Sequence, residues 1–413
     1  MHITPHRELA AKRLMAIAGH SHILKTDIGN FFPSVYTHSV SWAIYGKKLA
    51  KKNRRNTRWW GNVLDEAIRQ CNDQQTSGIP IGPGTSHIVA EIIMAKIDAH
   101  VQTKLKASSI AGYRHVDDYF LCFDSKKKAK NALAAIEKAA AEYELGINAR
   151  KTQILKSMEF MEESWPRKLN AIGAYRRRAK ITNWLTQFAS EAFYLAKKYP
   201  GDSVMKYALK ILRGMPLPKK GHPLRMDDWT LYESILIRIM SAYPYTVDRV
   251  AEILRKCQKK GYPLDKKKLS GAVSALIVQH APLEHHSEVA WALWLAKVAE
   301  LDITPKAAHF LPKVNSGVCA LLALDNRENK RIKKAKIDIT PWCEHLSKGG
   351  LIDQCWLLAY EAPRKEWLRN NKAYIEQSDF FSELHEWNIS FYDEDNDDAD
   401  FGESSDFGES SHP

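Results

Sequence analysis

Long hydrophobic runs are missing from this chain of 413 residues. One of the longest, Val289–Ala296, has eight apolar residues, whereas a membrane-spanning helix needs about 20. The six cysteines stand singly, and no two of them form a CxxC pair. These absences exclude a transmembrane protein, a disulfide scaffold and a zinc ribbon, and they favour a reducing, cytoplasmic environment.

Positive charge is missing from the C-terminal end. No Lys or Arg occurs between residues 391 and 413, which contain nine acids: Asp393, Glu394, Asp395, Asp397, Asp398, Asp400, Glu403, Asp406 and Glu409. The whole chain carries +13, so residues 1–390 carry +22. A body this basic attracts polyanions, of which nucleic acid is the commonest soluble one. A generally Lys-rich soluble protein is the alternative.

Hydrophobic residues, at 45 % of the chain, provide a full core, which excludes wholesale disorder. The pattern divides the chain into three regions, predicted as domains at 1–165, 166–390 and 391–413. The first mixes β-like runs, such as Ile23–Ile28 and Val116–Phe123, with helices, and therefore predicts an α+β domain.

The second region is helical in its periodicity. Its apolar stripes include one of Leu231, Ile235, Leu236 and Ile239 and another of Val247, Val250, Leu254 and Cys257. Two similar stretches, VAWALWL and DQCWLLAY, hint at stacked helical repeats. The third region repeats DFGESS and is predicted to be a disordered acidic tail, or an artefact of how the chain was made.

The positive charge is clustered. Seven cations fall within twelve residues without an acid between them, directly before Trp59–Trp60: Lys47, Lys48, Lys51, Lys52, Arg54, Arg55 and Arg58. Smaller clusters are Lys126–Lys128 with Lys130 and Arg176–Arg178 with Lys180. Cations beside aromatic rings suit a nucleic-acid surface, which combines phosphate neutralisation with base stacking. A solvated helix face is the alternative for each cluster.

Two adjacent acids, Asp117 and Asp118, lie between apolar β-forming residues in the stretch YRHVDDYFLCF. Burying uncompensated carboxylates costs several kcal/mol, so this placement favours a bound cation. An ordinary Asp-Asp turn is the alternative. Upstream, the segment HILKTDIGNFFPS predicts a strand that ends at Asp27. If the strands are neighbours in one sheet, the three acids meet, as a two-metal phosphoryl-transfer site requires.

Between these acids lies GIPIGPG, at Gly78–Gly84, followed by a predicted helix over Thr85–His100. A Gly/Pro turn that opens a helix lets the backbone approach a nucleotide or a template strand. No GK[ST] follows it, so the loop is not a Walker loop.

In this order and spacing, the motifs resemble those of reverse transcriptases. KTDIGNFFPS resembles motif A, GIPIGPGTSHIVAEI motif B, HVDD motif C and INARKT motif D. The runs at Asp27–Ser39, Trp42–Lys47 and Gln75–Ser86 resemble those of the abortive-infection and other phage-defence members. The resemblance covers residues 20–155 and implies a palm, an antiparallel sheet with helices and reduced fingers, followed by an all-α, helical-repeat-like domain.

The resemblance assigns roles by position. It implies that Asp27, Asp117 and Asp118 hold Mg²⁺, or Mn²⁺, and that Lys151 donates a proton to the leaving pyrophosphate. A surface lysine is the alternative for Lys151. Phe32 falls where an aromatic ring excludes a ribose 2′-hydroxyl, and core packing is its alternative. Ile81 and Gly82 fall in the dNTP-binding loop.

Three features depart from the family pattern. His115 stands at the usual Tyr of motif C, where it packs under the primer end or changes how that end is held. Ile81 replaces the Gln of templated enzymes. Only 26 residues precede Asp27, so the fingers are expected to be reduced, to be replaced by the helical domain or a partner, or to begin upstream.

The resemblance implies a DNA polymerase in bacterial antiphage defence. Such an enzyme would extend DNA from dNTPs, either on a noncoding RNA template or without a template from a protein hydroxyl, and would bind RNA or single-stranded DNA. The resemblance also implies a homo-oligomer or a defence-operon partner. The alternative is an inactive, RNA-binding scaffold. A nuclease in the helical domain is disfavoured, because residues 330–390 contain no Arg-x4–6-His pair and His285–His286 reads as a surface pair.

Overall fold

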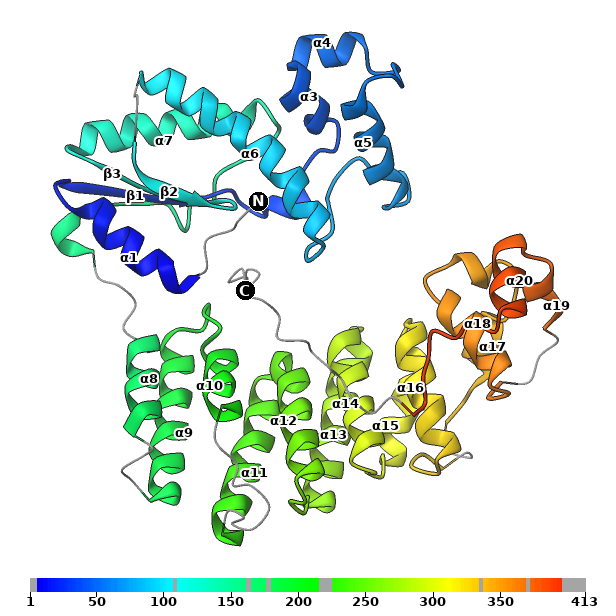
Figure 1. Ribbon diagram of the computed structural model, residues 1–413. Helices are drawn as coiled ribbons and strands as arrows, with labels where there is room; N and C mark the ends of the chain where they lie inside the picture. Colours follow the sequence, from blue (N-terminus) through cyan, green and yellow to red (C-terminus); the bar gives the residue numbers. More distant parts are fainter. Residues whose placement is uncertain are drawn as a thin grey trace. The chain divides into compact units, whose positions relative to one another are not determined.

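The structure is a computed structural model that describes residues 6–106, 110–160, 165–175, 180–214, 225–333, 337–368 and 372–395. These residues form two compact units, one ending at residue 160 and one beginning at residue 165 (Figure 1). In the described ranges, no helix is both long and apolar enough to cross a bilayer. Arg176–Arg178 and residues 396–413 of the predicted tail lie outside the described residues.

The N-terminal unit combines a small sheet with helices. Its elements are α1 (His6–Ile17), β1 (His22–Asp27), α2 (Phe31–Ser34), α3 (Ser39–Tyr45), α4 (Lys47–Lys52), α5 (Trp60–Gln70), α6 (Gly84–Leu105), β2 (Ala111–His115), β3 (Asp118–Phe123), α7 (Lys126–Ala141), β4 (Gln153–Lys156) and the 3₁₀ turn η1 (Ser157–Glu159). The strand order is β2-β3-β1-β4, and every neighbouring pair is antiparallel.

Alternating side chains bury both faces of this sheet. Leu24 and Leu121 face the core that α6 and α7 close, whereas Ile23, Phe120 and Cys122 face the side covered by α1 (Figure 1). The alternation follows from the two-residue period of a strand. With both faces covered, the strand β1 lies inside the unit, paired on both edges, and its last residue is Asp27.

The C-terminal unit consists of helices in the described ranges. They are α8 (Trp165–Tyr175), α9 (Ile181–Lys198), α10 (Val204–Arg213), α11 (Met226–Ala242), α12 (Val247–Lys259), α13 (Lys266–His280), α14 (His286–Val298), α15 (Pro305–Phe310), α16 (Gly317–Glu328), α17 (Thr340–Glu344), α18 (Trp356–Arg364), α19 (Ala373–Glu376) and α20 (Asp379–Glu386). Short 3₁₀ turns join some of them: η3 (Pro244–Thr246), η4 (Ala281–Leu283), η5 (Leu311–Lys313) and η7 (Gly350–Ile352).

The apolar stripes read from the sequence form the core of this unit. Val250, Leu254 and Cys257 of α12 are fully buried, as is Leu236 of α11. Successive helices lie side by side in chain order (Figure 1). A small antiparallel sheet with helices, followed by a helical part, agrees with the α+β and all-α classes expected for the two regions.

Candidate carboxylate site

The strand register brings the three acids to one end of the sheet. β1 and β3 pair so that Asp27 lies opposite Asp118, and Asp117 occupies the two-residue turn between β2 and β3. The backbone N–H of Ile28 donates to the carbonyl oxygen of Asp117 over 3.3 Å, which ties that turn to the end of β1. Residues 90 positions apart in the chain therefore become neighbours.

The acids differ in burial. Asp27 and Asp117 are buried, at 4 % and 7 % exposure, whereas Asp118 is exposed. Burial, followed by the negative charges of Asp118 and Asp27, raises the pKa of Asp117 to about 7, against a smaller lowering by Lys151. A carboxyl group with this pKa loses its proton more readily when a cation comes close.

Lys151 places a positive charge beside Asp27. Its Nζ lies 3.3 Å from Oδ2 of Asp27, and its side chain is 44 % exposed. The turn that carries it is fixed to β1, because Asn148 N–H donates to the Asp27 carbonyl over 2.9 Å and the hydroxyls of Thr152 and Thr26 lie 2.7 Å apart. Sequence reasoning missed Asn148 and Thr152, although both fall within INARKT.

The site offers oxygen ligands but no finished metal centre. Within the ranges that the structure describes, no three His, Cys, Asp or Glu side chains are arranged to hold a metal ion. Oδ1 of Asp27 is nevertheless buried without a hydrogen-bond partner, and an orphaned carboxylate oxygen is what a hard cation satisfies. A positive charge placed among these carboxylates would offset their mutual repulsion. The donor set fits a divalent cation in its chemistry.

The predicted nucleotide loop lies beside Phe32. The N–H of Ile79 donates to the Phe32 carbonyl over 3.0 Å, and the N–H of Gly78 donates to that of Val35 over 2.8 Å. Phe32 itself is 4 % exposed and meets the His87 ring edge-on at 5.3 Å. Ile81 is 58 % exposed, and Gly82 has a φ of 115°, which only glycine adopts easily.

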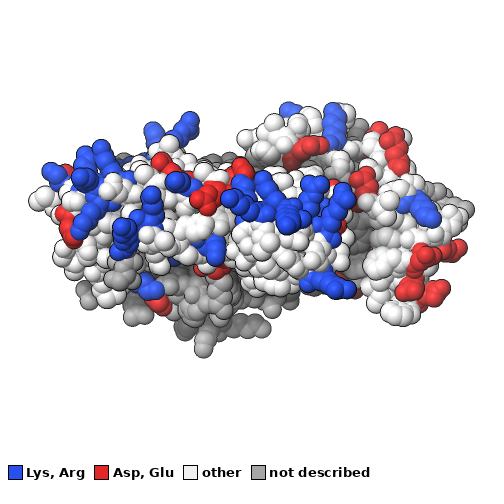
Figure 2. Space-filling model, turned by 90° about the horizontal axis from the view of Figure 1, so that it is seen from above, with Lys and Arg blue, Asp and Glu red and all other residues white. Residues whose placement is uncertain are grey.

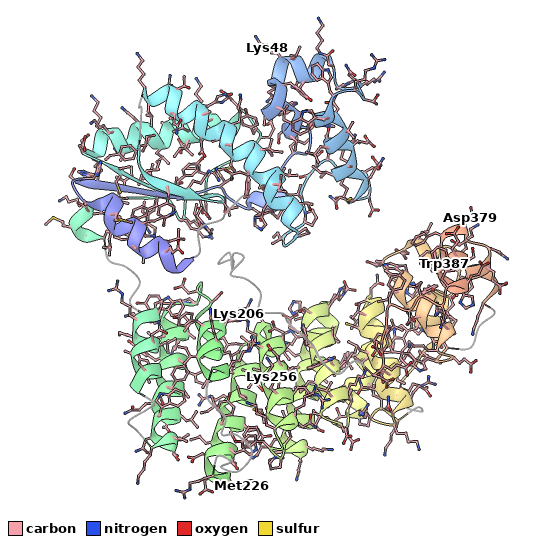
Figure 3. The ribbon with its side chains drawn as sticks, viewed as in Figure 1. Lys48, Lys206, Met226, Lys256, Asp379 and Trp387 are labelled. Atoms are coloured by element: carbon pink, nitrogen blue, oxygen red, sulfur yellow. The ribbon has the colours of Figure 1, made fainter. Side chains whose placement is uncertain are left out.

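The basic cluster occupies α4 and the loop that follows it. Figure 2 looks onto the side of the N-terminal unit that carries α4 and shows Lys and Arg side chains gathered there. Lys48 points outward from the helix (Figure 3), and Lys51, Lys52, Arg54, Arg55 and Arg58 follow it in the chain. Lys47 differs, because its Nζ pairs with Glu144 at 2.9 Å and lies 4.3 Å from the centre of the Trp42 ring. The exposed aromatic of this surface is Trp60, at 56 %.

His115 ends β2 directly opposite Asp118 and is half-buried. It therefore lies at the same end of the sheet as the acids.

Arg114, which precedes His115, was given no role in the sequence analysis, yet it makes several hydrogen bonds beside the acid pair. The sequence feature that could have drawn attention to Arg114 is an arginine placed between aromatic residues in a predicted strand.

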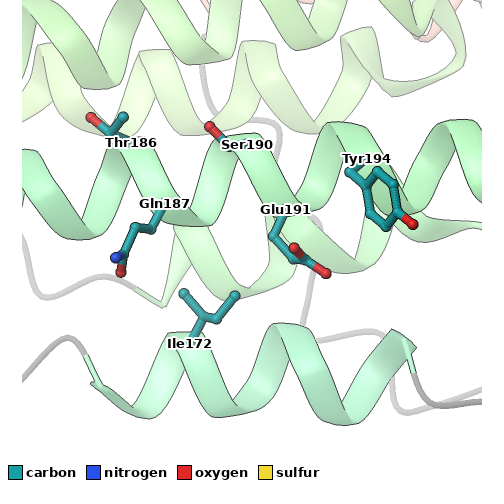
Figure 4. Close-up of a pocket in the computed structure, with 6 residues that line it drawn as sticks. All are labelled: Ile172, Thr186, Gln187, Ser190, Glu191 and Tyr194. Carbon is teal, nitrogen blue, oxygen red and sulfur yellow. The ribbon is translucent and has the colours of Figure 1, made fainter.

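A hollow in the C-terminal unit lies between α8 and α9. It is lined by Ile172, Thr186, Gln187, Ser190, Glu191 and Tyr194 (Figure 4). Every lining residue belongs to the C-terminal unit, so the hollow contributes no side chain to the carboxylate site.

Comparison with known protein families finds a match for the part of the chain that contains the carboxylate site. Residues 1–174 match the family model for reverse transcriptases, which are RNA-dependent DNA polymerases. The match extends into α8, the first helix of the C-terminal unit. A comparison with curated proteins found no match. Residues 1–174 thus carry a reverse transcriptase domain, which implies nucleotide polymerase activity.

Proposed function

We propose that this chain is a Mg²⁺-dependent DNA polymerase of the reverse transcriptase type that acts in bacterial defence against phage. The observation that carries the proposal is the β1–β3 register, which sets Asp27 opposite Asp118 with Asp117 in the adjoining turn. Buried acids at one sheet end are costly without a cation. In a domain that matches reverse transcriptases, such acids would hold the divalent cation needed for phosphoryl transfer.

Asp27 and Asp117 would hold the divalent cation, Mg²⁺ or Mn²⁺, with Asp118 as the exposed third acid. The bound ions supply activation of the attacking hydroxyl and neutralisation of the leaving pyrophosphate. Lys151, beside Asp27 and partly exposed, would hold a proton for the leaving group.

The substrate roles rest on position. Phe32 would exclude the ribose 2′-hydroxyl, which selects dNTPs, and the loop with Ile81 and Gly82 would approach the incoming nucleotide with its backbone. The cluster from Lys47 to Arg58 would bind the phosphates of RNA or single-stranded DNA, and His115 would support the primer end.

Incorporation of labelled dNTPs tests the proposal. Purified chain is incubated with Mg²⁺ and one dNTP at a time, with and without RNA, beside Asp117→Asn and a matched control, Asp124→Asn. Asp124 is an exposed acid that pairs with Lys128. We expect incorporation by the wild type and by Asp124→Asn, and a loss of about 10³-fold or more in Asp117→Asn. Equal incorporation by Asp117→Asn would refute the polymerase assignment.

The same assay separates the two modes of synthesis. Incorporation that depends on added or copurifying RNA indicates templated copying. Incorporation of a single dNTP without RNA, together with DNA that stays attached to the denatured protein, indicates protein priming. Sequencing the nucleic acid that copurifies with the chain identifies the template or product.

The role in defence and the assembly state rest on the resemblance to phage-defence members. We expect that expression in bacteria lowers phage plating in the wild type but not in Asp117→Asn, and that the purified chain forms an oligomer or requires an operon partner. Light scattering of the pure chain distinguishes the two assembly states.

A scaffold without catalysis is the second candidate. The observation that favours it is the Lys151–Asp27 ion pair, together with the lack of an assembled ligand group in the described ranges. In that case Asp117→Asn binds RNA and protects against phage as well as the wild type does, and neither protein incorporates dNTPs.

A further inference from the structure

The turn that carries the acid pair has a strained backbone. Only Val116 and Asp117 join β2 to β3, and Val116 has a φ of 55°. A positive φ at the first of two turn residues is the type II′ pattern, which normally takes glycine. A β-branched residue there is an outlier whose backbone is strained. Contacts around the turn must therefore hold it.

Arg114 makes side-chain contacts that hold the turn, in addition to the backbone bond from Ile28 to Asp117. Its Nη1 donates to the Val116 carbonyl over 2.6 Å. The same guanidinium forms a two-pronged pair with Glu91, at 2.7 and 2.9 Å, and its Nε donates to Asp98 over 2.9 Å. Arg114 therefore links the turn directly to α6.

The network is closed by Tyr119. Tyr119 pairs with Arg114 across β2 and β3, so both side chains lie on the same face of the sheet. Its hydroxyl donates to Asp98 over 2.7 Å. Glu91 and Asp98 are seven residues apart, two turns along one face of α6.

Burial strengthens this network. The Arg114 side chain is only 9 % exposed, so its bonds are poorly screened by water. Burial by itself lowers the pKa of Arg114, but the two carboxylates outweigh it and raise the pKa. Burial, with the charge of Asp98, also raises the pKa of Tyr119. Arg114 therefore keeps its charge and Tyr119 its proton.

The opposite face of the hairpin is held differently. Tyr113 stacks on Phe120 at 5.8 Å, and Arg13 of α1 donates to the Tyr113 hydroxyl over 2.8 Å. Gly112 lets the strands approach there, since a Cβ on it would lie 2.1 Å from the Phe120 carbonyl oxygen. Arg13 contacts Tyr113 and Phe120, which lie outside the Val116–Asp117 turn.

We propose that Arg114 is a positioning residue of the carboxylate site. It fastens the strained turn at Val116 to Glu91 and Asp98 of α6, and so sets where Asp117 and Asp118 lie relative to Asp27. This inference rests on the proposed polymerase function for its kinetic consequence, although the restraint on the turn is independent of it.

Arg114→Lys and Arg114→Gln test the proposal. Both lose the forked geometry, and only lysine keeps the charge. We expect kcat for dNTP incorporation to fall about 10–100-fold and Mn²⁺ affinity, measured by electron paramagnetic resonance, to fall about tenfold. The KM for dNTP changes less, because the nucleotide loop is untouched. The matched control, Arg13→Gln, lowers the melting temperature but leaves kcat and Mn²⁺ affinity within about twofold.

Val116→Gly provides a second test, because glycine adopts the positive φ without strain. If Arg114 serves to hold the turn, Val116→Gly restores part of the kcat and Mn²⁺ affinity lost in Arg114→Lys. A double mutant that shows the plain product of the two single effects contradicts the proposal.

Amide hydrogen exchange over Tyr113–Phe123 decides the outcome even without polymerase activity. If the wild type neither incorporates dNTPs nor binds Mn²⁺, the proposed function fails, and faster exchange in Arg114→Gln than in Arg13→Gln still supports the restraint. Equal exchange overturns it. If the wild type is active and Arg114→Lys keeps kcat and Mn²⁺ affinity, the inference fails while the function stands. Should Arg114→Gln not fold, Tyr119→Phe takes its place.

Discussion

Phe32 combines a position typical of a sugar gate with a nearly complete burial. Its side chain is 4 % exposed and its ring packs against the rings of Phe31 and His87, so it contributes to the core in either role. The two roles respond differently to substitution. A change that keeps most of the volume preserves the core but alters the shape presented to a ribose.

Phe32→Leu should therefore separate the two roles. We expect its preference for dNTP over rNTP to fall by at least about tenfold, which is a loss of about 1.4 kcal/mol in discrimination. Phe31→Leu, which changes a neighbouring ring that is 1 % exposed, serves as the control and should keep the preference. The preference for dNTP over rNTP is measured by competition between the two labelled nucleotides. Equal loss in both variants would assign Phe32 to packing alone.

Lys47 and its neighbour Lys48 should also differ. Lys47 pairs with Glu144, donates to the Glu142 carbonyl and lies over Trp42, whereas Lys48 points outward. Lys47→Ala should lower the free energy of unfolding by about 0.5–1 kcal/mol. Lys48→Ala should leave it unchanged but reduce the salt dependence of RNA binding by about 0.7 in log–log slope. Denaturant melts and fluorescence anisotropy measure the two effects, and the reverse assignment would contradict the structure.

At the scale of elements, the segment after α20 closes the helical unit. Phe391 N–H donates to Glu361, the Tyr392 hydroxyl donates to Asp325 over 2.7 Å, and the Glu394 carbonyl accepts from Lys297 over 2.7 Å. Asp325 and Glu361 are each 1 % exposed. The first residues of the predicted acidic tail, 391–395, therefore satisfy charges buried among α14, α16 and α18.

Tyr392→Phe should lower the stability of this unit. It leaves the buried Asp325 with Lys297, at 3.0 Å, and with the Asn329 side-chain amide, at 2.6 Å, but without the tyrosine hydroxyl. Because the acceptor is charged and buried, we expect the free energy of unfolding to fall by about 1.5–3 kcal/mol. Tyr194→Phe, at a ring that is 56 % exposed, is the control and should stay within about 0.5 kcal/mol. A change of similar size in both variants would mean that the Tyr392–Asp325 bond adds no stability to the unit.

At the scale of the whole chain, opposite charges are separated along the sequence. Residues 396–413 contain six acids and no cation, so their removal raises the net charge from +13 to +19. The long-range field of the basic body then acts on polyanions with less opposition. The chain without this segment should consequently bind single-stranded RNA more tightly at low salt.

Deletion of residues 396–413 tests this expectation. Affinity for RNA should rise at least about twofold at 50 mM salt, and the difference should vanish near 0.5 M because screening shortens the range of charge interactions. A chain with the six acids changed to their amides keeps the length and should behave like the deletion. If only the deletion binds more tightly, the effect is steric rather than electrostatic.

Local patterns in the sequence were enough to predict several elements. The β-like run at Ile23–Ile28 lies within one residue of β1 at each end, and GIPIGPG leads into α6, which begins at Gly84. The stripes of α11 and α12 are buried apart from Leu231, which is partly buried. The strand predicted over Val116–Phe123 begins two residues later, at Asp118, because the turn takes Val116 and Asp117. Such features depend on neighbours within a few positions, which the sequence displays directly.

Tertiary structure alone decided which distant residues meet. The register of β1 against β3 sets Asp27 opposite Asp118, and the packing of α6 on the sheet brings Glu91 and Asp98 to Arg114. It also divides the basic cluster, since Lys47 is committed to Glu144. These outcomes depend on the strand register and on which face of a helix packs on the sheet, and the local sequence pattern is compatible with more than one choice of each. Residue types and local spacing determined the kind of chemistry, and long-range packing determined which side chains share it.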